Sequence, residues 1–461
     1  MSVIREHAIE IIRTLRATGH QAYLCGGCVR DLLLGCEPAD YDVTTDATPT
    51  EVMRIFPDTY EVGAHFGVVL VPLPASNGGA IASDALPGGP AEHSSKHPHV
   101  VEVATFRSDI GYSDGRHPDQ VRFSKDPRED VMRRDFTING LLLDPISYQV
   151  LDFVDGRKDL EHGIIRAIGD PEQRFIEDKL RMLRAVRFAA RFAYEMEAAT
   201  FAAIERLASD IGQVSRERMR DELTKMLIEG RAHRAFLLLD QTGLLPEVLP
   251  EISAMKGVAQ PPEYHPEGDV FVHTLLLLEN LPHPCPRTLA WGALLHDVGK
   301  PPTFRVAPDR IRFDGHVEVG VKMAERICRG LRFSNDDIEQ IVALVANHMR
   351  FADVTRMKES TLKRFLRLPR FQEHLELHRI DCQASHGDLT SYYFTRNKLE
   401  ATPTENIRPT PLVTGRDLIA AGYIPGPRFK QILSSVEDSQ LEGTLVSKEQ
   451  ALEFVARNFP V

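Results

Sequence analysis

The sequence predicts a mixed α/β head followed by a mostly α-helical remainder. Between Ala22 and about Pro145 lie five short apolar runs typical of strands, namely AYLCGG, YDVTTD, FGVVLVPL, HVVEVATF and INGLLLDP. After Pro145 the apolar residues take helical spacing, beginning with PEQRFIEDKLRMLRAVRFAARFAYE. Ahead of the first strand, one face of an opening helix is predicted by Ile4, Ala8, Ile11, Ile12 and Leu15.

Composition indicates a globular protein of several domains. The chain has 461 residues, of which 43% are hydrophobic and 26% charged, and this length is typical of roughly three or four domains. It contains no apolar run long enough to cross a bilayer and does not open with a signal peptide. Six cysteines without an export signal predict free thiols in the cytoplasm. The C-x-x-C of Cys25 and Cys28 has no second pair with which to complete a zinc site, which favours free thiols there too.

Changes of composition along the chain divide it into four predicted segments. The head contains an insertion rich in Gly, Pro, Ala and Ser, which is predicted to be flexible because it cannot pack a core. The Pro-rich PPEYHP marks a boundary between two helical parts, the second of which is dense in histidine. The segments are the head 1–150 with its insertion 74–99, the neck and body 151–260, the histidine-rich part 261–390 and the tail 391–461.

The charge balance restricts where a nucleic acid could bind. The formal net charge of −11 has the wrong sign for a general nucleic-acid binder, since phosphate contacts need Lys and Arg. A local basic strip is predicted within residues 174–234, where Arg184, Arg187 and Arg191 fall on one side of a helix. Spacing alone does not separate an RNA-binding stripe from an ordinary solvated helix face.

A pair of carboxylates in the head predicts a metal site. Asp40 and Asp42 lie two apart in a run of strand type, so both side chains are expected on one face of the sheet. Mg²⁺ takes its oxygen ligands from one or two carboxylates together with water and substrate phosphates. Upstream, Gly26 and Gly27 permit close backbone approach, and a helix predicted to open at about Cys28 directs free N–H groups at an anion. The stretch therefore predicts a site for a nucleoside triphosphate and its metals.

Four motifs in order resemble a known family. The glycine pair with VRDLLLG and DYD is followed by RRDFTING (133–140), DFVDGRKDL (152–160) and RFIEDKLRMLRAVRFAAR (174–191). Together they resemble the class II polymerase-beta-type nucleotidyltransferases that build the 3′-terminal CCA of tRNA, and the related bacterial poly(A) polymerases. The resemblance covers the first half of the chain and implies a polymerase-beta-like palm in the head.

The resemblance also implies which residues bind the nucleotide. Asp40 and Asp42 would be the catalytic metal ligands, and Gly26, Gly27 and Arg30 would belong to the first motif. The second motif, which contacts sugar and phosphates in the family, is matched by Arg133, Arg134, Asp135 and Asn139. The E-D-x-x-R motif that selects the base is matched by Glu177, Asp178 and Arg181, followed on the neck by Arg184 and Arg187.

The chemistry of Asp178 and Arg181 agrees with selection of C and A. Both are expected on one patch of a single predicted helix, at spacing i and i+3. A carboxylate accepts from the amino group that C and A share, and a guanidinium donates to their unprotonated ring nitrogen. U and G reverse both groups, so their rejection by several kcal/mol is expected. Without the flanking motifs, an ordinary intrahelical ion pair is the simpler interpretation.

A second site is predicted in the histidine-rich part. Imidazoles and carboxylates are ligands typical of transition-metal sites. The ordered series resembles the HD phosphohydrolase domain, in which His273, His296, Asp297 and Asp381 would hold one metal and His316 with His348 would help to hold a second. A transition metal such as Mn²⁺, Fe²⁺ or Ni²⁺ is implied. The alternative is an inactive domain retained to bind RNA.

The sequence thus predicts a template-independent nucleotidyltransferase that adds CMP and AMP to tRNA 3′ ends from CTP and ATP, with Mg²⁺ and without a membrane. An HD phosphohydrolase or phosphodiesterase activity accompanies this prediction. A poly(A) polymerase, or an enzyme that adds only CC or A, is the nearest alternative, although GAHFGVVLVPL lacks the basic stretch typical of poly(A) polymerases. The alternative from another class is a metal-dependent phosphohydrolase whose first half only holds RNA.

Overall fold

The computed structural model describes residues 2–61, 67–73, 100–112, 115, 118–263 and 265–460. The predicted insertion 74–99 lies outside the described residues. Contacts divide the chain into two compact units, the first formed by Met1–Glu222 with Leu237–Val248 and the second by Leu223–Phe236 with Leu249–Val461. Of the helices in the described ranges, none combines the length and apolar character that crossing a membrane requires.

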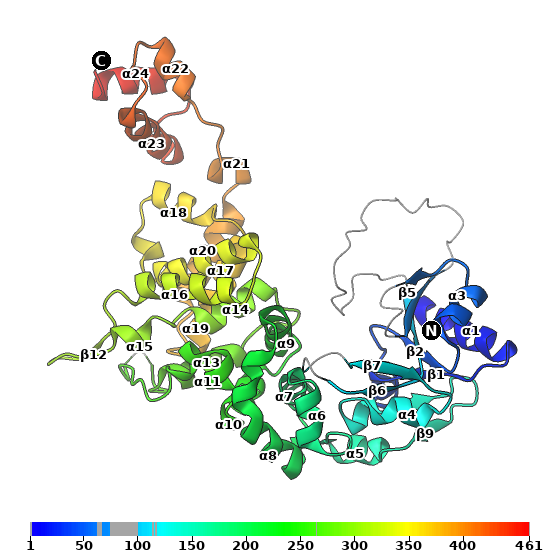
Figure 1. Ribbon diagram of the computed structural model, residues 1–461. Coiled ribbons are helices and arrows are strands. Elements are labelled where there is room, and N and C mark those ends of the chain that lie inside the picture. The colour runs from blue at the N-terminus through cyan, green and yellow to red at the C-terminus, as the bar shows by residue number, and fades with distance from the viewer. Residues whose placement is uncertain are drawn as a thin grey trace. The chain divides into compact units, whose positions relative to one another are not determined.

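The first unit contains a seven-stranded mixed sheet in the order β3-β4-β5-β2-β1-β8-β9 (Figure 1). Strands β2 and β5 pair in parallel, and the other neighbours are antiparallel. The five runs predicted as strands correspond to β1, β2, β4, β5 and β8, so the predicted α/β head is confirmed. The strands are β1 Ala22–Cys25, β2 Asp42–Thr45, β3 Tyr60–Glu61, β4 Val68–Pro72, β5 Val100–Thr105, β8 Leu141–Leu143 and β9 Val150–Asp152.

Helices α1 and α3 pack against this sheet and form the core with it. The predicted apolar face of α1 is buried at Ala8, Ile11, Ile12 and Leu15. Strand β5 alternates between buried and half-buried residues, which leaves Glu102 on the face opposite that of Val101 and Val103. The other head elements are α1 Val3–Ala17, α2 Gly27–Leu33, α3 Pro49–Ile55, the hairpin β6 Arg107–Ile110 with β7 Gln120–Phe123, α4 Pro127–Met132, η2 Thr137–Asn139 and α5 Gly156–His162.

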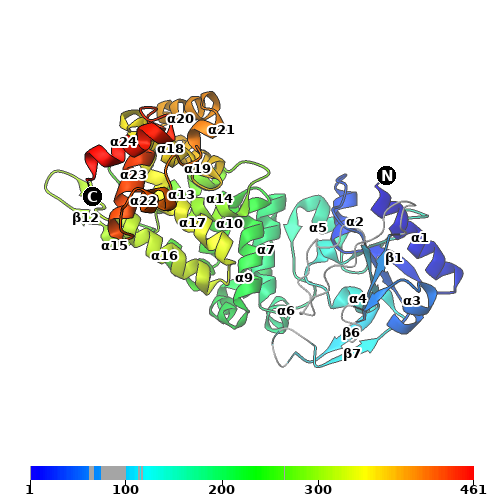
Figure 2. The same cartoon turned by 90° about the horizontal axis from the view of Figure 1, so that it is seen from above.

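Helices follow the head, and α7 and α9 lie side by side (Figure 2). The two short strands β10 and β11 pair in parallel. These elements are β10 Ile164–Ile165, α6 Pro171–Glu177, α7 Leu180–Phe192, β11 Glu195–Met196, α8 Ala198–Leu207, η3 Ala208–Gln213, α9 Arg216–Ile228, α10 Ala232–Gln241 and α11 Leu245–Val248.

The second unit is mostly helical. Its largest fully buried side chain is Trp291, whose Nε1 donates to Thr224 Oγ1 at 2.9 Å. A separate cluster around Leu418, Ile432 and Val455 forms the core of the last helices. The elements are α12 Pro250–Ser253, α13 Val270–Glu279, α14 Arg287–Leu295, α15 Lys300–Thr303, β12 Arg305–Val306, β13 Ile311–Arg312, α16 His316–Gly330, α17 Asn335–Asn347, η4 His348–Arg356, α18 Glu359–Leu366, α19 Phe371–Ala384, α20 Thr390–Ala401, α21 Thr404–Ile407, α22 Gly415–Ala420, α23 Pro427–Leu441 and α24 Lys448–Asn458.

Candidate active sites

A glycine turn connects β1 to α2 at the predicted triphosphate site. Gly26 has φ +71°, and a Cβ there would lie 3.0 Å from Arg134 Nη1, so both the backbone and the space around it favour glycine. Helix α2 begins at the next residue, Gly27. Cys25 and Cys28 flank the turn as buried free thiols. Burial raises the pKa of Cys25 to about 11, which keeps this thiol protonated and chemically inert.

The structure gathers three carboxylates at the start of β2. Asp42 is the first residue of the strand, and its register partner on β5 is Glu102. Asp40 lies in the bend before β2, exposed to solvent. The prediction that Asp40 shares the strand with Asp42 was therefore wrong, because the strand starts only where pairing with β5 begins. Among the described residues, all groups of three or more potential ligand atoms within 4.8 Å of one another lie in the second unit. The three head carboxylates therefore do not offer three oxygen atoms, one from each, that all lie within 4.8 Å of one another.

The electrostatics of Asp42 are unusual for an aspartate. Burial, then the negative charges of Glu102 and Asp40, raise its pKa to about 7, and Arg134 opposes the shift only weakly. Glu102 belongs to none of the family motifs, but its place in the predicted strand HVVEVATF already indicated either a third carboxylate at this site or an ion pair at its rim. Uncompensated negative charge at a partly buried position favours a bound cation.

Arg133 and Arg134 are both held by Asp130, which the sequence motifs did not single out. The Asp130 carboxylate is fully buried and accepts from Arg133 Nη2 at 2.6 Å and from Arg134 Nη2 at 2.9 Å. Burial alone would raise the pKa of Asp130, but the two arginines outweigh it and lower the pKa to about 2. Asp130 lies on α4 one turn before its partners, so the i, i+3 and i, i+4 spacing was a usable signal.

Asp135, Asn139, Arg30 and Arg184 form one hydrogen-bonded chain. Arg30 Nη1 donates to Asn139 Oδ1 at 2.7 Å, and Asn139 Nδ2 donates to Asp135 Oδ1 at 3.1 Å. Arg184 Nε and Nη2 donate to Asp135 Oδ2 at 2.9 and 2.7 Å. Four of the predicted nucleotide-binding residues are thus brought together as partners of one another, linking the second motif to α7.

Arg187 lies buried between α7 and α9. Its Nε donates to Glu222 Oε2 at 2.7 Å, and its guanidinium stands 4.3 Å from the centre of the Phe188 ring. Arg184 and Arg30 also face this ring, each at 5.3 Å. The Arg187 side chain is therefore neither exposed to solvent nor available for a phosphate, because it is buried and its charge is neutralised by Glu222.

The base-selection residues do not lie on one helix. Helix α6 ends at Glu177, and Asp178 adopts extended backbone with φ −147° before α7 begins. The predicted i, i+3 pair on one continuous helix was wrong, because the Asp178 side chain accepts from Leu180 N at 3.1 Å and caps α7.

Asp178 and Arg181 each have a different partner. Arg218 Nη2 donates to Asp178 Oδ2 at 2.7 Å, and Nη1 donates to Oδ1 at 3.2 Å. Arg181 Nη1 donates to Glu177 Oε2 at 2.8 Å, and Nη2 donates to the carbonyl oxygen of Arg133 at 3.2 Å. Both side chains are therefore fixed in orientation before any base binds.

In the second unit, Asp297 stands at the centre of four imidazoles. Its Oδ2 lies 3.1 Å from His296 Nε2 and 4.0 Å from His273 Nε2. Its Oδ1 lies 3.7 Å from His348 Nε2 and 4.0 Å from His316 Nε2. These residues come from α13, the end of α14, the start of α16 and the end of α17.

Asp381 on α19 completes the cluster, since its Oδ1 lies 3.1 Å from His273 Nε2. The ligand atoms of the six predicted residues form two groups, each within 4.8 Å: His273 with His296 and Asp381, and Asp297 with His316 and His348. A third group joins His273 to His265 and Glu267. The structure thus brings all six predicted HD residues together.

The histidines are oriented as metal ligands require. The Nδ1 atoms of His296, His348 and His316 lie 2.8, 2.7 and 3.0 Å from backbone carbonyl oxygens three residues earlier. A neutral imidazole held in this way carries its proton on Nδ1, so that Nε2 can offer its lone pair to a metal ion beside Asp297. Without a metal ion, Nε2 can instead take a proton and face the carboxylate as a cation. All three Nε2 atoms are buried without a hydrogen-bond partner. Unsatisfied buried nitrogens around a carboxylate fit a divalent metal ion.

Lys300 and Gly299 complete the turn after Asp297. Lys300 Nζ lies 2.7 Å from Asp297 Oδ2. Burial would raise the pKa of Asp297, but His296 and Lys300 hold it well below its ordinary value. A Cβ on Gly299 would lie 2.0 Å from the carbonyl oxygen of His316, so only glycine lets α16 start this close to the site. Burial lowers the pKa of His348 to about 4, which keeps its imidazole neutral.

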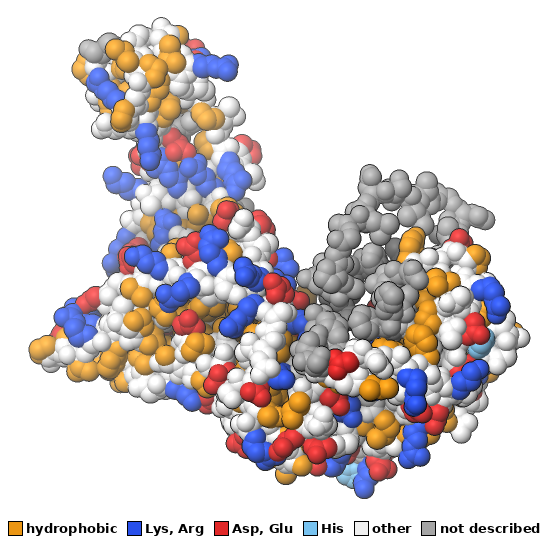
Figure 3. All heavy atoms as spheres, viewed as in Figure 1, with side chains coloured by type: hydrophobic (Ala, Val, Ile, Leu, Met, Phe, Trp, Pro, Cys, Tyr) orange, Lys and Arg blue, Asp and Glu red, His pale blue; other side chains and the backbone are white. Residues whose placement is uncertain are grey.

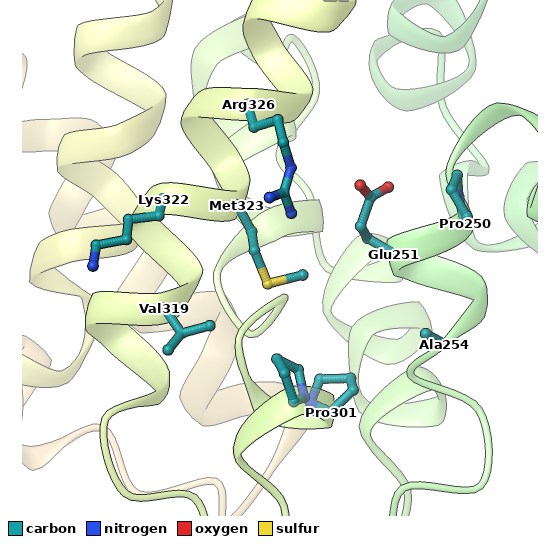
Figure 4. Close-up of a pocket in the computed structure, with 9 residues that line it drawn as sticks. Pro250, Glu251, Ala254, Pro301, Val319, Lys322, Met323 and Arg326 are labelled. Atoms are coloured by element: carbon teal, nitrogen blue, oxygen red, sulfur yellow. The ribbon is translucent and has the colours of Figure 1, made fainter.

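A surface pocket beside this site has a different character. It has a volume of about 670 Å³ and is lined by Pro301 and by residues of α12 and α16. Glu251 and Arg326 stand on opposite walls, and Met323 lies below Arg326 on the wall formed by α16 (Figure 4). Its lining is mostly apolar and presents no group of metal ligands.

Three family models match parts of this chain. The Poly A polymerase head domain matches residues 22–79 and 88–166. The Probable RNA and SrmB- binding site of polymerase A matches residues 193–256, and the HD domain matches residues 270–380.

Two similar curated relatives are both named CCA-adding enzyme. The chain is 39% identical over 253 residues to a CCA-adding enzyme of Lactobacillus helveticus, an alignment of 55% of this chain and 57% of that protein. It is 41% identical over 218 residues to the CCA-adding enzyme of Lactiplantibacillus plantarum, covering 47% of this chain and 48% of the relative. The chain thus spans about half the length of the curated relatives it matches.

Solved structures match over nearly the whole chain. The Bacillus stearothermophilus CCA-adding enzyme in complex with CTP has a TM-score of 0.73 at 26% identity, covering 99% of this chain and 98% of that one. The Thermotoga maritima CCA-adding enzyme complexed with tRNA has the same fold, with a TM-score of 0.57 at 18% identity and coverage of 98% and 94%. The head fold and its site thus define a polymerase-type nucleotidyltransferase domain, joined to an HD domain. Family models thus match a Poly A polymerase head, an RNA-binding region and an HD domain in this chain, which resembles CCA-adding enzymes in sequence and in fold.

Proposed function

We propose that this protein is a CCA-adding enzyme, which transfers CMP and AMP from CTP and ATP to the 3′ end of tRNA without a nucleic-acid template. The observation that carries the proposal is the carboxylate cluster of Asp40, Asp42 and Glu102 beside the glycine turn, in the same compact unit as Asp178 and Arg181. The names of the curated relatives and of the CTP-bound structural neighbour support it.

The head carboxylates fit Mg²⁺ because their negative charge is uncompensated, as the raised pKa of Asp42 shows. Asp40 and Asp42 would hold these ions, which when bound would supply activation of an attacking hydroxyl and stabilisation of a leaving pyrophosphate. The protein's own contribution is to hold Asp42 and Glu102 side by side on the sheet, with Asp40 in the bend just before β2, and to leave the glycine turn open for the phosphates.

The second motif supplies positive charge and sugar contacts. Asp130 holds Arg133 and Arg134 in place through two ion pairs. Each guanidinium keeps further N–H donors for phosphate oxygens. We assign Arg30, Asp135 and Asn139 to the frame that ties these arginines to α7, with Gly26 and Gly27 contacting the triphosphate. Arg184 and Arg187 hold the neck against this frame.

Base selection follows from two pre-oriented side chains. Asp178, held by Arg218, keeps lone pairs that accept from the amino group of C or A. Arg181, held by Glu177, keeps N–H donors for the ring nitrogen. Because the carboxylate and the guanidinium are already fixed, little conformational entropy is lost when C or A binds. When U or G occupies the site, these buried polar groups have no hydrogen-bond partner on the base.

The chain also offers an exposed basic surface for the RNA backbone. Lys and Arg side chains gather over the region of α18 and α21 (Figure 3). Among the residues there, Arg356, Lys358, Arg370 and Arg408 are exposed. Local positive charge of this kind attracts phosphates although the whole chain carries −11. We further propose that the protein acts in the cytoplasm. We also propose that its domains correspond to the four segments 1–150, 151–260, 261–390 and 391–461.

The decisive experiment supplies each labelled triphosphate separately to tRNAs that end before CCA, after C and after CC. We expect two additions of C followed by one of A. A long A tail would instead identify a poly(A) polymerase, and addition at only one of the three ends would identify a partial enzyme. Incorporation of U by the wild-type protein would refute the selection argument. The variant Asp42→Asn should abolish every addition.

We propose a second activity, metal-dependent hydrolysis of phosphate esters at the HD site. The observation that favours it is the set of buried, unpartnered Nε2 atoms around Asp297. His273, His296, Asp297 and Asp381 would hold one transition metal ion, and His316 with His348 would help to hold another. Such an ion, when bound, would lower the pKa of its water enough to provide a hydroxide nucleophile at neutral pH. Lys300, 2.7 Å from Asp297, is placed to neutralise a phosphate oxygen.

Two variants separate the activities. Asp297→Asn should lose hydrolysis of phosphate esters and keep nucleotide addition, whereas Asp42→Asn should do the opposite. If wild-type protein hydrolyses phosphate esters but incorporates no triphosphate into any tRNA end, the alternative of a hydrolase whose first half holds RNA replaces the main proposal. If the wild-type protein hydrolyses no phosphate ester in the presence of Mn²⁺, Fe²⁺ or Ni²⁺, the proposal of a second activity is refuted.

A further inference from the structure

A short loop ahead of the HD domain contacts the HD site through two side chains. This entry loop, residues 258–269, precedes the matched domain, which begins at residue 270, and is described except at residue 264. A β-bridge joins Ala259 to Asp269, and Gln260 N donates to the carbonyl oxygen of Gly268 at 3.0 Å. The ends of the loop are thus fixed to each other, which holds the side chains between them in place.

Glu267 of the entry loop contacts a metal-ligand candidate directly. Its Oε1 lies 2.8 Å from His273 Nδ1 and 2.9 Å from His265 Nδ1. The His265 and His273 rings meet edge to face, 4.9 Å apart. On the other side of the His273 ring, Nε2 lies 3.1 Å from Asp381 Oδ1. The ring is completely buried, so Glu267 and Asp381 together set its orientation.

His273 differs in this respect from the other histidines of the site. His296, His316 and His348 place Nδ1 against carbonyl oxygens of their own chain segment. Among these four histidines only His273 places Nδ1 against a carboxylate. A carboxylate at this position fixes the tautomer with the proton on Nδ1 and makes Nε2 a stronger donor to a metal. The ligand strength of His273 therefore depends on a residue six positions earlier, outside the HD domain.

The entry loop also reaches the opposite side of the site. Gln260 is buried, and its Oε1 accepts from Lys300 Nζ at 2.6 Å. Lys300 Nζ in turn lies 2.7 Å from Asp297 Oδ2. Two side chains of one loop thus support two members of the HD site, a histidine and the lysine beside its central aspartate.

We propose that the entry loop is a part of the HD metal site, in which Glu267 is a positioning residue for His273 and Gln260 a positioning residue for Lys300. This inference rests on the proposed metal-dependent hydrolase. Removal of carboxylates that orient metal-bound histidines typically weakens metal binding by about 10–100-fold. The full HD site is then larger than the HD domain and cannot be transplanted without the loop.

The test measures metal affinity rather than turnover. Ni²⁺, which prefers imidazole ligands, is titrated calorimetrically into the full-length protein in excess Mg²⁺, which occupies the carboxylate site of the head. We expect Glu267→Ala to weaken Ni²⁺ binding by about 10–100-fold and Glu267→Gln, which keeps an acceptor oxygen, to weaken it less. Glu263→Ala, an exposed position of the same loop, is the matched control and should bind Ni²⁺ as the wild type does.

The outcomes separate this inference from the proposal beneath it. If His296→Ala binds Ni²⁺ as the wild type does, the HD cluster is not the metal site and both ideas fail. If His296→Ala loses Ni²⁺ and Glu267→Ala retains wild-type affinity, only the role of the entry loop is refuted. Melting curves in chelator show whether each variant is folded. Should Glu267→Ala be unfolded, Glu267→Gln decides the question, and unchanged affinity in that variant overturns the inference.

Discussion

Replacing Asp42 by asparagine should stabilise the metal-free protein while abolishing its transfer activity. In the folded chain the pKa of Asp42 is raised from its ordinary value of 3.8 to about 7 by burial, Glu102 and Asp40. A raised carboxyl pKa means that folding is most favourable below the unfolded pKa and loses stability as the pH rises through the folded pKa. Asparagine carries no charge and removes this cost.

The size of the effect follows from the two pKa values. The difference between 3.8 and about 7 corresponds to about 4 kcal/mol above pH 7, because one pKa unit equals about 1.4 kcal/mol. At pH 5 the corresponding cost is about 1.6 kcal/mol. Asp42 is only partly buried, and water screens part of its repulsion, so a measured gain of about 1–3 kcal/mol at pH 8 is expected. This corresponds to a rise in melting temperature of roughly 2–4 °C for each kcal/mol.

The assay is thermal unfolding of the wild type and Asp42→Asn in chelator at pH 5 and pH 8. The matched control is Asp46→Asn, just beyond the end of the same strand, where the carboxylate accepts from Gln21 N at 2.8 Å and lies 3.3 Å from His20 Nδ1. Because that charge has partners, its removal should bring no gain. The reasoning is refuted if Asp42→Asn melts at or below the wild type at pH 8, or gains as much at pH 5 as at pH 8.

Three further predictions concern single aspartates. Asp178→Ala should raise the ratio of kcat/KM for UTP over CTP at least tenfold in single-addition assays, since the acceptor for the amino group is lost; an unchanged ratio would contradict the selection role. Asp130→Asn should lower the free energy of unfolding in urea at pH 7 by about 3 kcal/mol, because Arg133 and Arg134 lose a buried partner. The wild type should lose the same contribution when the pH is lowered from 3.8 to about 2. Equal stability of the variant and the wild type at pH 7 would contradict this role of Asp130. Asp297→Asn should lose phosphate-ester hydrolysis and all Ni²⁺ binding while nucleotide addition stays within twofold of wild type, which parallel assays on one preparation check.

The α/β head and the HD cluster could be predicted because their signals are local. Five apolar runs between turns identify five strands, and the spacing of HD, with histidines before and after it, identifies a ligand set whatever its exact packing. The glycine turn is also a local signal, since Gly26 must adopt positive φ. In each case neighbouring residues in the chain carry enough information to define the element.

The break at Asp178 and the partners of the arginines could not be predicted in the same way. An aspartate inside an apolar-periodic segment fits a helix interior and an N-terminal cap equally well, and only the hydrogen bond to Leu180 N distinguishes them. Arg187 pairs with Glu222, 35 positions away. Periodicity places Arg187 on a helix face, but it does not say which acid a second helix will bring to that face.

Asp42 and Asp297 show that the charges around a buried aspartate decide whether the pKa of its carboxyl group rises or falls. Burial raises the pKa of both carboxyls. At Asp42 the neighbours are Glu102 and Asp40, so the pKa rises further, and the missing positive charge must come from a bound ion. At Asp297 the neighbours are His296 and Lys300, so the pKa falls and the carboxylate is compensated by the chain itself. Chelation should therefore leave Asp42 with only the weak opposing charge of Arg134, whereas Asp297 keeps Lys300 Nζ at 2.7 Å.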